Sequence, residues 1–167
     1  MQTIISDKKY LFISIKPEFV LKILEEEKRI ELRKVKPNVN VGDNVILYAS
    51  SPVKSVLAFS IVKQIIDTTP KQMWKLHSKS LGIDKERFDN YYEGKDRAIG
   101  IELRNIIQTK PIHLNNLRDF FPHFQPPQIY KYITEIDKFK DIFETEYPMG
   151  SIDKTTLRSL PHAQNIL

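Results

Sequence analysis

The sequence predicts a single α+β domain in which several strands lie close together in the chain and helices flank them. The expected order is strand, helix, several strands, helices and a final strand, which is typical of α+β folds. The 167 residues are long enough for one core and short for two, and no repeat, low-complexity run or composition shift marks a linker. This order is compatible with a small barrel plugged by helices, although the pattern alone does not separate a barrel from an open sheet.

The first half of the chain is expected to supply most of the strands. Residues Tyr10–Ile15 are largely apolar and are expected to form the first strand. Pro17 then suits the first turn of a helix, because its missing N–H costs nothing there, and this helix is expected to run to about residue 27. Three more strands are expected at residues 29–35, 44–49 and 54–67, the last being one long strand or two joined by a bend.

The second half is expected to alternate helices with shorter strands. Thr69 and Pro70 form an N-cap and first-turn pair for one helix, and Asp84 can cap another that ends at Gly94. A strand is expected at residues 98–108, a short helix at 111–121, a Pro-rich extended connection at 122–128, a short strand at 129–133 and a helix at 134–147. We therefore expect one domain over residues 1–147, ending in a helical extension, and a C-terminal tail over residues 148–167.

Composition and charge narrow the function classes. Lys and Arg number 26 against 21 Asp and Glu, giving a net charge of +5 that favours a polyanionic partner. Cysteine is absent, which excludes disulfides, thiolate metal sites and Cys nucleophiles and suits a reducing compartment. No signal peptide or apolar run of about 20 residues is present, so we expect a cytoplasmic protein without a membrane partner.

Common metal and nucleotide motifs are missing. The four histidines show neither H-x-H nor H-E-x-x-H spacing, and neither G-x-x-x-x-G-K-[ST] nor G-x-G-x-x-G occurs. The sequence therefore predicts no metal site and no cofactor.

The most informative segment is Lys28-x-x-Glu31-x-Arg33. In a strand, the period of two places Ile30 and Leu32 on the core face and Glu31 and Arg33, together with Arg29, on the other, with Lys28 at the helix-to-strand junction. One interpretation is a solvated strand whose charges form weak ion pairs. The other is a cleft in which Glu31 orients Lys28 or Arg33 while these cations meet phosphate or carbonyl oxygens.

Four further residues are candidates for ligand binding. Lys16 precedes the first helix, where backbone N–H groups and a cation can together hold an anion, or it is a surface lysine. Tyr48, Ser50 and Ser51 end a strand, where they can stack on or hydrogen-bond a base, or Tyr48 packs in the core.

Aromatic residues offer a second candidate surface. Trp74, Tyr91 and Tyr92 can form a stacking platform for a single strand, although the helical spacing of Trp74 with Met73 and Leu76 favours a core position for it.

Several short motifs, in this order and spacing, resemble the ASCH family over residues 10–133. The motifs are Ser14-Ile15-Lys16-Pro17, Lys28-x-x-Glu31-x-Arg33, Val41-Gly42-Asp43-x-Val45, Tyr48-Ala49-Ser50, Tyr92-Glu93-Gly94, Ala98-Ile99-Gly100-Ile101 and Gln125-Pro126-Pro127-Gln128. The resemblance implies a small PUA-like β-barrel with helices covering its ends and a cleft near the helix-to-strand junction. It also implies RNA binding linked to translation or transcription.

The resemblance leaves an enzymatic alternative open. Some relatives of similar fold hydrolyse the amide of an acylated modified cytidine, using a Lys and a Thr on this segment; Lys28 matches that Lys, and Glu31 stands at the Thr position. A carboxylate does not supply the same hydroxyl nucleophile. Other relatives are reported to act as ribonucleases, which keeps hydrolysis of RNA open.

Three function hypotheses follow. The first is binding of RNA or a nucleotide-like ligand, with DNA as a further polyanion, by Lys16, Lys28, Glu31, Arg33, Tyr48, Ser50 and Ser51. The second is a hydrolase that acts on a modified nucleoside or RNA in the same cleft, with Lys28 and Glu31 as catalytic residues. The third is a protein-interaction module that uses the aromatic and Pro-rich residues 120–127.

Overall fold

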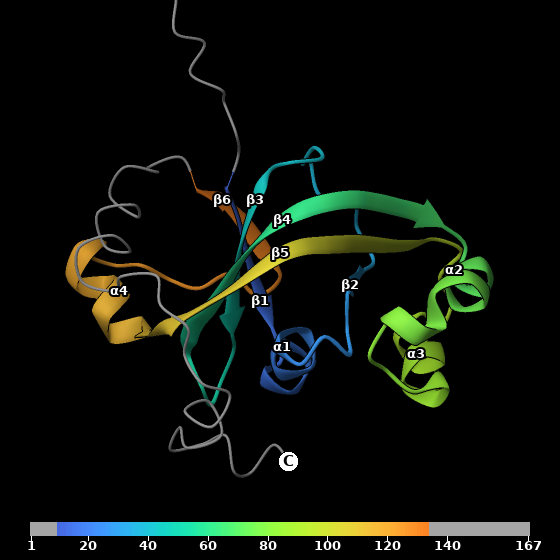
Figure 1. Cartoon of the computed structure of the whole chain (residues 1–167), viewed down its shortest axis with the longest axis horizontal. Coiled ribbons are helices and arrows are strands. Elements are labelled where there is room, and N and C mark those ends of the chain that lie inside the picture. Colours follow the sequence, from blue (N-terminus) through green and yellow to red (C-terminus); the bar gives the residue numbers. More distant parts are fainter. Residues whose placement is uncertain (1–9, 134–167) are drawn as a thin grey trace, which may run out of the picture.

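A computed structural model of the chain describes residues 10–133, which form six strands and four α-helices (Figure 1). In chain order the elements are β1 (Tyr10–Ile15), α1 (Pro17–Leu24), β2 (Ile30–Arg33), β3 (Asn44–Ala49), β4 (Ser55–Thr68), α2 (Pro70–His77), the 3-10 turn η1 (Ser78–Ser80), α3 (Lys85–Tyr91), β5 (Ala98–His113), α4 (Leu114–Phe120) and β6 (Tyr130–Ile133). Within this part of the chain, no helix is both long and apolar enough to cross a membrane.

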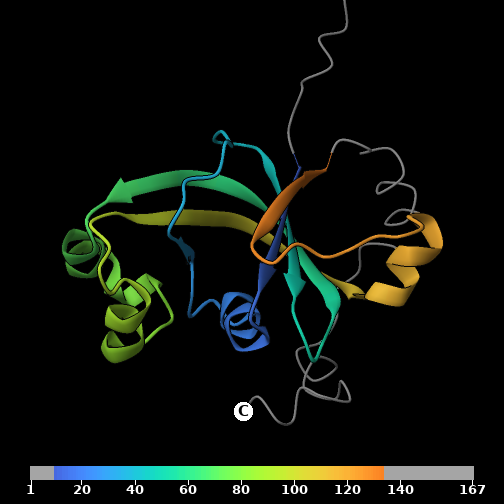
Figure 2. The ribbon, with the colours of Figure 1, turned by 180° about the vertical axis from the view of Figure 1, so that it is seen from behind.

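The strands form one mixed sheet in the order β2-β5-β4-β3-β1-β6. Strand β1 runs parallel to β3, and every other neighbouring pair is antiparallel. The sheet curls into a half-barrel, so the predicted α+β class is confirmed. Strands β2 and β6 are its two edges within the described residues, and Figure 2 shows the curl from behind.

The long strands β4 and β5 span the molecule, with α4 at one end and α2 and α3 at the other (Figure 1). The central core lies between the curled sheet and α1, which contributes Val20 and Ile23. A second cluster joins α4 to β1 and β3, and a third joins α2 and α3 to β2. Helices therefore cover both ends of the sheet and leave α1 beside its middle.

Local sequence signals explain where the helices begin. Thr69 accepts a hydrogen bond from Gln72 N at 3.2 Å, with Pro70 in the first turn of α2. Asp84 accepts one from Arg87 N at 2.8 Å and caps α3. Both caps match the sequence prediction.

Several predicted boundaries were wrong. The helix predicted to end at Gly94 ends at Tyr91, and the strand predicted at residues 29–35 spans Ile30–Arg33. Helix α1 ends at Leu24, because Glu26 adopts a positive φ of 63° that no α-helix tolerates. The helix expected from residue 111 begins at Leu114, because β5 continues through Pro111 to His113. Pro111 is accommodated where the register with β4 shifts, since a residue without N–H is tolerated at a strand irregularity. The helix predicted at 134–147 and the tail at 148–167 lie outside the described residues.

Candidate functional site

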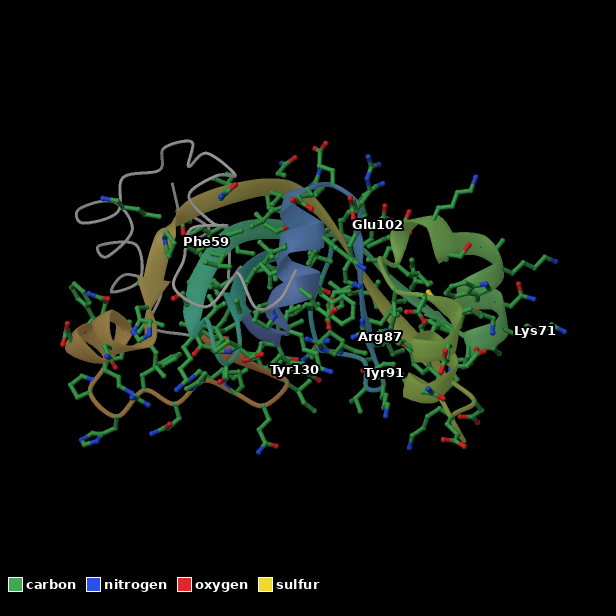
Figure 3. All side chains as sticks on the ribbon, turned by 90° about the horizontal axis from the view of Figure 1, so that it is seen from below. Phe59, Lys71, Arg87, Tyr91, Glu102 and Tyr130 are labelled. Carbon is green, nitrogen blue, oxygen red and sulfur yellow. The ribbon has the colours of Figure 1, made fainter. Side chains whose placement is uncertain are left out.

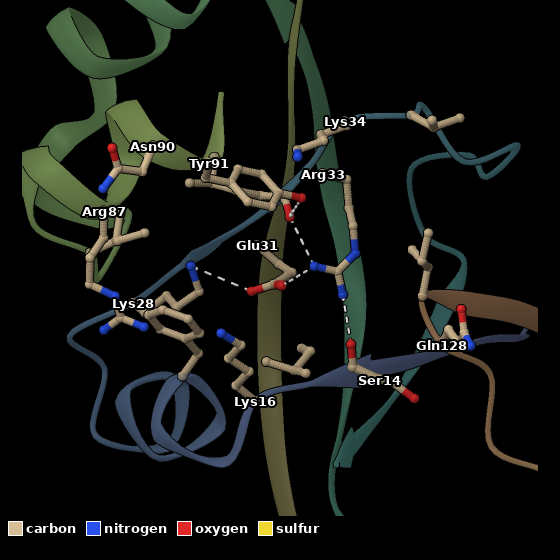
Figure 4. Close-up of a pocket in the computed structure, with 16 residues that line it drawn as sticks. Ser14, Lys16, Lys28, Glu31, Arg33, Lys34, Arg87, Asn90, Tyr91 and Gln128 are labelled. Carbon is tan, nitrogen blue, oxygen red and sulfur yellow. Dashed lines mark hydrogen bonds and ion pairs between the residues drawn. The ribbon is translucent and has the colours of Figure 1, made fainter. Parts of the chain in front are cut away.

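A pocket of about 750 Å³ occupies the gap between the edge strand β2 and strand β1. Its walls come from the end of β1, the start of α1, β2 and the residues after it, α3, and residues 128–129 before β6 (Figure 4). Since the sheet is a half-barrel, β2 pairs only with β5 among the described residues and its other edge is free to border this gap. The charged lining residues are Lys16, Lys28, Glu31, Arg33, Lys34 and Arg87.

Glu31 lies at the floor of the pocket between two cations. Its carboxylate pairs with Lys28 Nζ at 3.4 Å through Oε2 and accepts a hydrogen bond from Arg33 Nη1 through Oε1. Glu31 is only 5% exposed. A carboxylate this deeply buried is stabilised by charged partners on either side of it, which the two cations supply.

Lys28 is held by a segment far away in the sequence. Its Nζ donates to the carbonyl of Leu81 at 2.6 Å, and its methylene groups lie against Gly82. A Cβ at position 82 would lie 2.7 Å from Lys28 Cβ, and Gly82 has a φ of +61°, so glycine is required on both counts. Burial lowers the pKa of Lys28, and the nearby Glu31 carboxylate opposes that shift.

Arg33 connects the two sides of the gap. It donates through Nη2 to the carbonyl of Ser14 on β1 at 2.9 Å and through Nη1 to its neighbour's carbonyl, that of Leu32, at 2.9 Å. This side chain thus bridges strands that do not pair with each other. In the floor, defined as Lys28, Glu31 and Arg33, each charged group has at least one partner, while Glu31 Oε2 and Arg33 Nε make no hydrogen bond within the described residues.

The rim of the pocket, defined as Lys16, Lys34 and Arg87, is more open to solvent. Lys16 and Lys34 are exposed; Lys34 Nζ lies 4.6 Å from the centre of the Tyr91 ring. Arg87 is paired with Glu18 through two hydrogen bonds of 3.0 and 2.7 Å, and its guanidinium lies 5.0 Å from the Phe19 ring centre. The rim therefore carries three cations, of which only Arg87 is ion-paired within residues 10–133.

Helix α3 supplies one wall. Arg87 and Tyr91 are four residues apart, so they share a helix face, and Figure 3 shows them side by side. Tyr91 is half-buried; burial raises its pKa, while the positive charge of Arg33 works in the opposite direction. Its ring and that of Phe19 give the pocket aromatic surface, and Ile83, Val35 and Ile129 add aliphatic surface.

The structure brings together four of the seven residues proposed from the sequence. Lys16, Lys28, Glu31 and Arg33 all line the pocket. Glu31 and Arg33 share it as the strand period predicts, whereas Arg29 does not line it. Leu32, placed on the core face by the same period, is 5% exposed and also borders the pocket.

The other three residues lie elsewhere. Tyr48 is 2% exposed and packs 5.4 Å from the Phe12 ring in the cluster beside α4, where burial raises its pKa to about 12. Ser50 donates its N–H to the carbonyl of Ile15, and Ser51 is exposed in the following turn. None of the three lines the pocket. The alternative interpretation of Tyr48, a packed tyrosine, is the one that the structure supports.

Sequence reasoning missed the contributions of Lys34 and Arg87 and placed Tyr91 only on a possible platform with Trp74. Trp74 instead packs 5.1 Å from Phe88 in the cluster of α2 and α3. The sequence did indicate α3 itself, because Asp84 caps its first turn and sets where the helix begins. Nothing in the sequence shows that this face turns toward β2.

The stretch at residues 120–127, proposed as a protein-interaction surface, directs its phenylalanine rings toward the fold, while Pro122, His123 and Gln125 are exposed. Phe124 is 8% exposed, and Phe120 and Phe121 pack against the cluster beside α4. Arg118 and Lys131 fasten this stretch by donating to the carbonyls of Phe124 and Gln125 at 3.1 and 3.0 Å. Its aromatic rings are therefore used mainly in the fold.

Comparison with known proteins identifies relatives of this chain in sequence and in structure. Residues 8–118 match the family model described as Domain of unknown function (DUF365). An ASCH domain-containing ribonuclease of Zymomonas mobilis is 31% identical over 126 residues, covering 75% of this chain and 85% of the relative. The crystal structure of ASCH from Zymomonas mobilis superposes with a TM-score of 0.78 at 27% identity, covering 83% of this chain and 96% of that one.

A more distant structure shares the fold alone. The N-terminal domain of Staphylothermus marinus McrB matches with a TM-score of 0.54 and 15% identity over 81% of this chain and 93% of its own. The chain belongs to the family described as Domain of unknown function (DUF365) and to the ASCH domain proteins.

Proposed function

We propose that the pocket binds a nucleotide unit of single-stranded RNA, with a phosphate at the rim and the remainder of the unit directed toward the floor. The observation that carries this proposal is the charge of the lining, in which five basic side chains accompany one carboxylate. The volume of about 750 Å³ falls within the range of small-molecule sites, which is roughly 300–1,000 Å³. Aromatic side chains beside cations are the usual means of holding single-stranded nucleic acid.

The division between rim and floor decides where the phosphate goes. Lys28 and Arg33 already donate to Glu31 or to backbone carbonyls, so a phosphate at the floor would displace those partners and face the Glu31 carboxylate. Lys16 and Lys34 have no carboxylate partner within residues 10–133. An anion therefore gains more at the rim, because the lysines there are held only by the charge of Glu18 near Lys16 and by the Tyr91 ring near Lys34, and not by a close ion pair.

The family relationship supports RNA over DNA as the partner. The relative with 31% identity is named as a ribonuclease, and this chain covers 85% of its length. DNA stays the second candidate polyanion, because a phosphate rim does not distinguish the two backbones.

A salt titration of RNA binding tests this proposal. We expect the affinity for a fluorescent single-stranded RNA decamer to fall with salt, and the double variant Lys16→Ala/Lys34→Ala to reduce both affinity and salt slope. Each phosphate contact in a single strand contributes about 0.7 to the slope of log K against log salt. The control is Lys71→Ala/Lys75→Ala, which removes the same charge from exposed positions of α2 outside the pocket. Equal losses in both double variants would contradict the proposal.

Cleavage of RNA in the same pocket is a second candidate function. Burial lowers the pKa of Lys28, which enlarges the neutral fraction that can accept a proton, and the relative's name points to the same reaction. We expect turnover of RNA to be lost in Lys28→Met while the folded state survives. Turnover that persists in this variant would show that Lys28 takes no part in the reaction. If the unchanged protein does not cleave RNA, the cleavage hypothesis is wrong and only the binding proposal remains.

A further inference from the structure

An unsatisfied oxygen at the pocket floor points to the group that binds there. Glu31 Oε2 has no hydrogen-bond partner within the described residues, although Lys28 Nζ lies 3.4 Å away as an ion pair. Its sister atom Oε1 accepts from Arg33. A buried acceptor without a donor is costly, so such an atom in a binding pocket indicates a missing donor from a ligand.

From this atom we infer that the pocket reads the Watson–Crick edge of an unpaired nucleobase, with Glu31 Oε2 accepting from a ring or exocyclic N–H of the base. This inference rests on the proposed binding of a nucleotide unit. It goes further by assigning the base, rather than the ribose or phosphate, to the floor, and by requiring that the base be unpaired.

The chemistry of the floor suits a base edge better than a phosphate. Glu31 Oε2 accepts, and Lys28 Nζ beside it donates, so the floor presents an acceptor next to a donor. The pairing edge of every nucleobase presents a donor beside an acceptor, which is the complementary pattern. A phosphate has only acceptors and would lie against the Glu31 carboxylate. A base edge can instead donate to Glu31 Oε2 and accept from Lys28 Nζ.

The walls suit the flat faces of a ring that enters edge first. The Tyr91 ring lines the pocket from α3, and the side chains of Val35 and Ile129, which are 62% and 54% exposed, also line it. Aromatic and apolar surfaces in the lining favour a planar ligand, because every base has two π-faces that stack. With the base so placed, its sugar and phosphate emerge toward the rim.

One side chain must move for the edge to reach Glu31, because Oε2 has no accessible surface without a ligand. The Lys16 side chain is exposed and makes no hydrogen bond or ion pair shorter than 4 Å within residues 10–133, although its charge lowers the pKa of Glu18; Figure 4 shows it pointing toward the floor. Its displacement breaks no such contact. With its ammonium turned away from Glu31, Lys16 can follow the phosphate.

A set of three cytidine pentanucleotides tests the inference. Unmodified cytidine keeps the N–H at N4, 5-methylcytidine keeps the pairing edge while adding a methyl group elsewhere, and N4,N4-dimethylcytidine has no N–H at that edge. We expect the first two to bind alike and the third to bind about tenfold or more weakly, because a site built to bond a polar group rejects an analogue that lacks it.

The variant Glu31→Gln provides the second arm. Arg33 Nη1 donates to Oε1, so the amide oxygen is expected to remain on that side and the amide nitrogen to replace Oε2. The acceptor then becomes a donor, and the preference for cytidine over its N4,N4-dimethyl analogue should fall below about threefold. A thermal melt checks that this variant is folded.

The outcomes separate this inference from the function on which it rests. If all three pentanucleotides bind alike while Lys16→Ala/Lys34→Ala still weakens binding, base reading is wrong and phosphate binding stands. If 2′-deoxycytidine loses affinity instead of the dimethyl analogue, the ribose occupies the floor and the inference is wrong. If the protein binds neither the pentanucleotides nor an RNA of greater length, the proposed function itself is wrong.

Discussion

The floor and the rim of the pocket hold similar numbers of cations and treat them in opposite ways. At the floor, Lys28 and Arg33 are enclosed and bound to Glu31 and to backbone carbonyls. At the rim, Lys16 and Lys34 are exposed and have no carboxylate partner within residues 10–133. This difference shows that not every cation of a basic pocket is available to bind phosphate. The buried cations hold the site in shape, whereas the exposed cations can contact a ligand.

The largest effect on stability is expected when the carboxylate of the floor is removed. Glu31→Ala leaves the buried Lys28 and the partly buried Arg33 without a carboxylate, and breaking a buried pair in this manner costs about 3–5 kcal/mol. We expect this loss in the free energy of unfolding, measured by urea denaturation. Glu27→Ala, which removes the same charge from an exposed position, should stay within about 0.5 kcal/mol. Similar losses in the two variants would contradict an organised floor.

The aromatic wall links the two regions, and its removal should reduce RNA affinity more than stability. Tyr91→Ala is expected to cost about 1–3 kcal/mol of binding free energy, the usual range for one stacked base. Tyr91→Phe should bind nearly as the unchanged protein, because the hydroxyl already contacts the Leu32 carbonyl at 3.5 Å and the Arg33 side chain, and the ring that stacks is kept. Anisotropy titrations of both variants decide this, and a large loss in Tyr91→Phe would show that the hydroxyl, and not the ring, binds the ligand.

The burial of Lys28 should appear as a pH dependence of stability. Its folded pKa lies below the ordinary 10.5, so between those two values the unfolded chain binds more protons than the native state. The free energy of unfolding contributed by Lys28 therefore rises with pH across that window. We expect the unchanged protein to gain stability relative to Lys28→Met as the pH approaches 10.5 from below. A difference that is constant with pH would mean that Lys28 is solvated.

The smallest effect is expected at Arg87. Its pair with Glu18 is partly exposed, so Arg87→Ala should change the free energy of unfolding by no more than about 1 kcal/mol. If Arg87 contacts a phosphate, the salt slope of RNA binding should fall by about 0.7 in the same variant. An unchanged slope would restrict the phosphate site to Lys16 and Lys34.

The part of the site that the sequence predicts is the part made by one short segment. Alternation along β2 places Glu31 and Arg33 on one face, and Lys28 precedes them at the junction. The same reasoning could not place Tyr48. Five of the six residues of β3 are buried, so alternation along this strand does not indicate which face contacts a ligand.

The remaining contacts depend on how distant segments meet. Lys28 finds its acceptor at Leu81, 53 residues away, and Arg33 finds Ser14 across an unpaired edge. Neither contact has a local period or motif. The fold class, by contrast, follows from element order and from caps such as Thr69 and Asp84, each of which acts within three residues.

A crystal structure of the protein with the cytidine pentanucleotide tests the division between floor and rim most directly. The account predicts phosphate oxygens within hydrogen-bond distance of Lys16 or Lys34, with Glu31 still paired to Lys28 and Arg33. A phosphate held by Lys28 and Arg33, with the Glu31 carboxylate turned away from them, would contradict it.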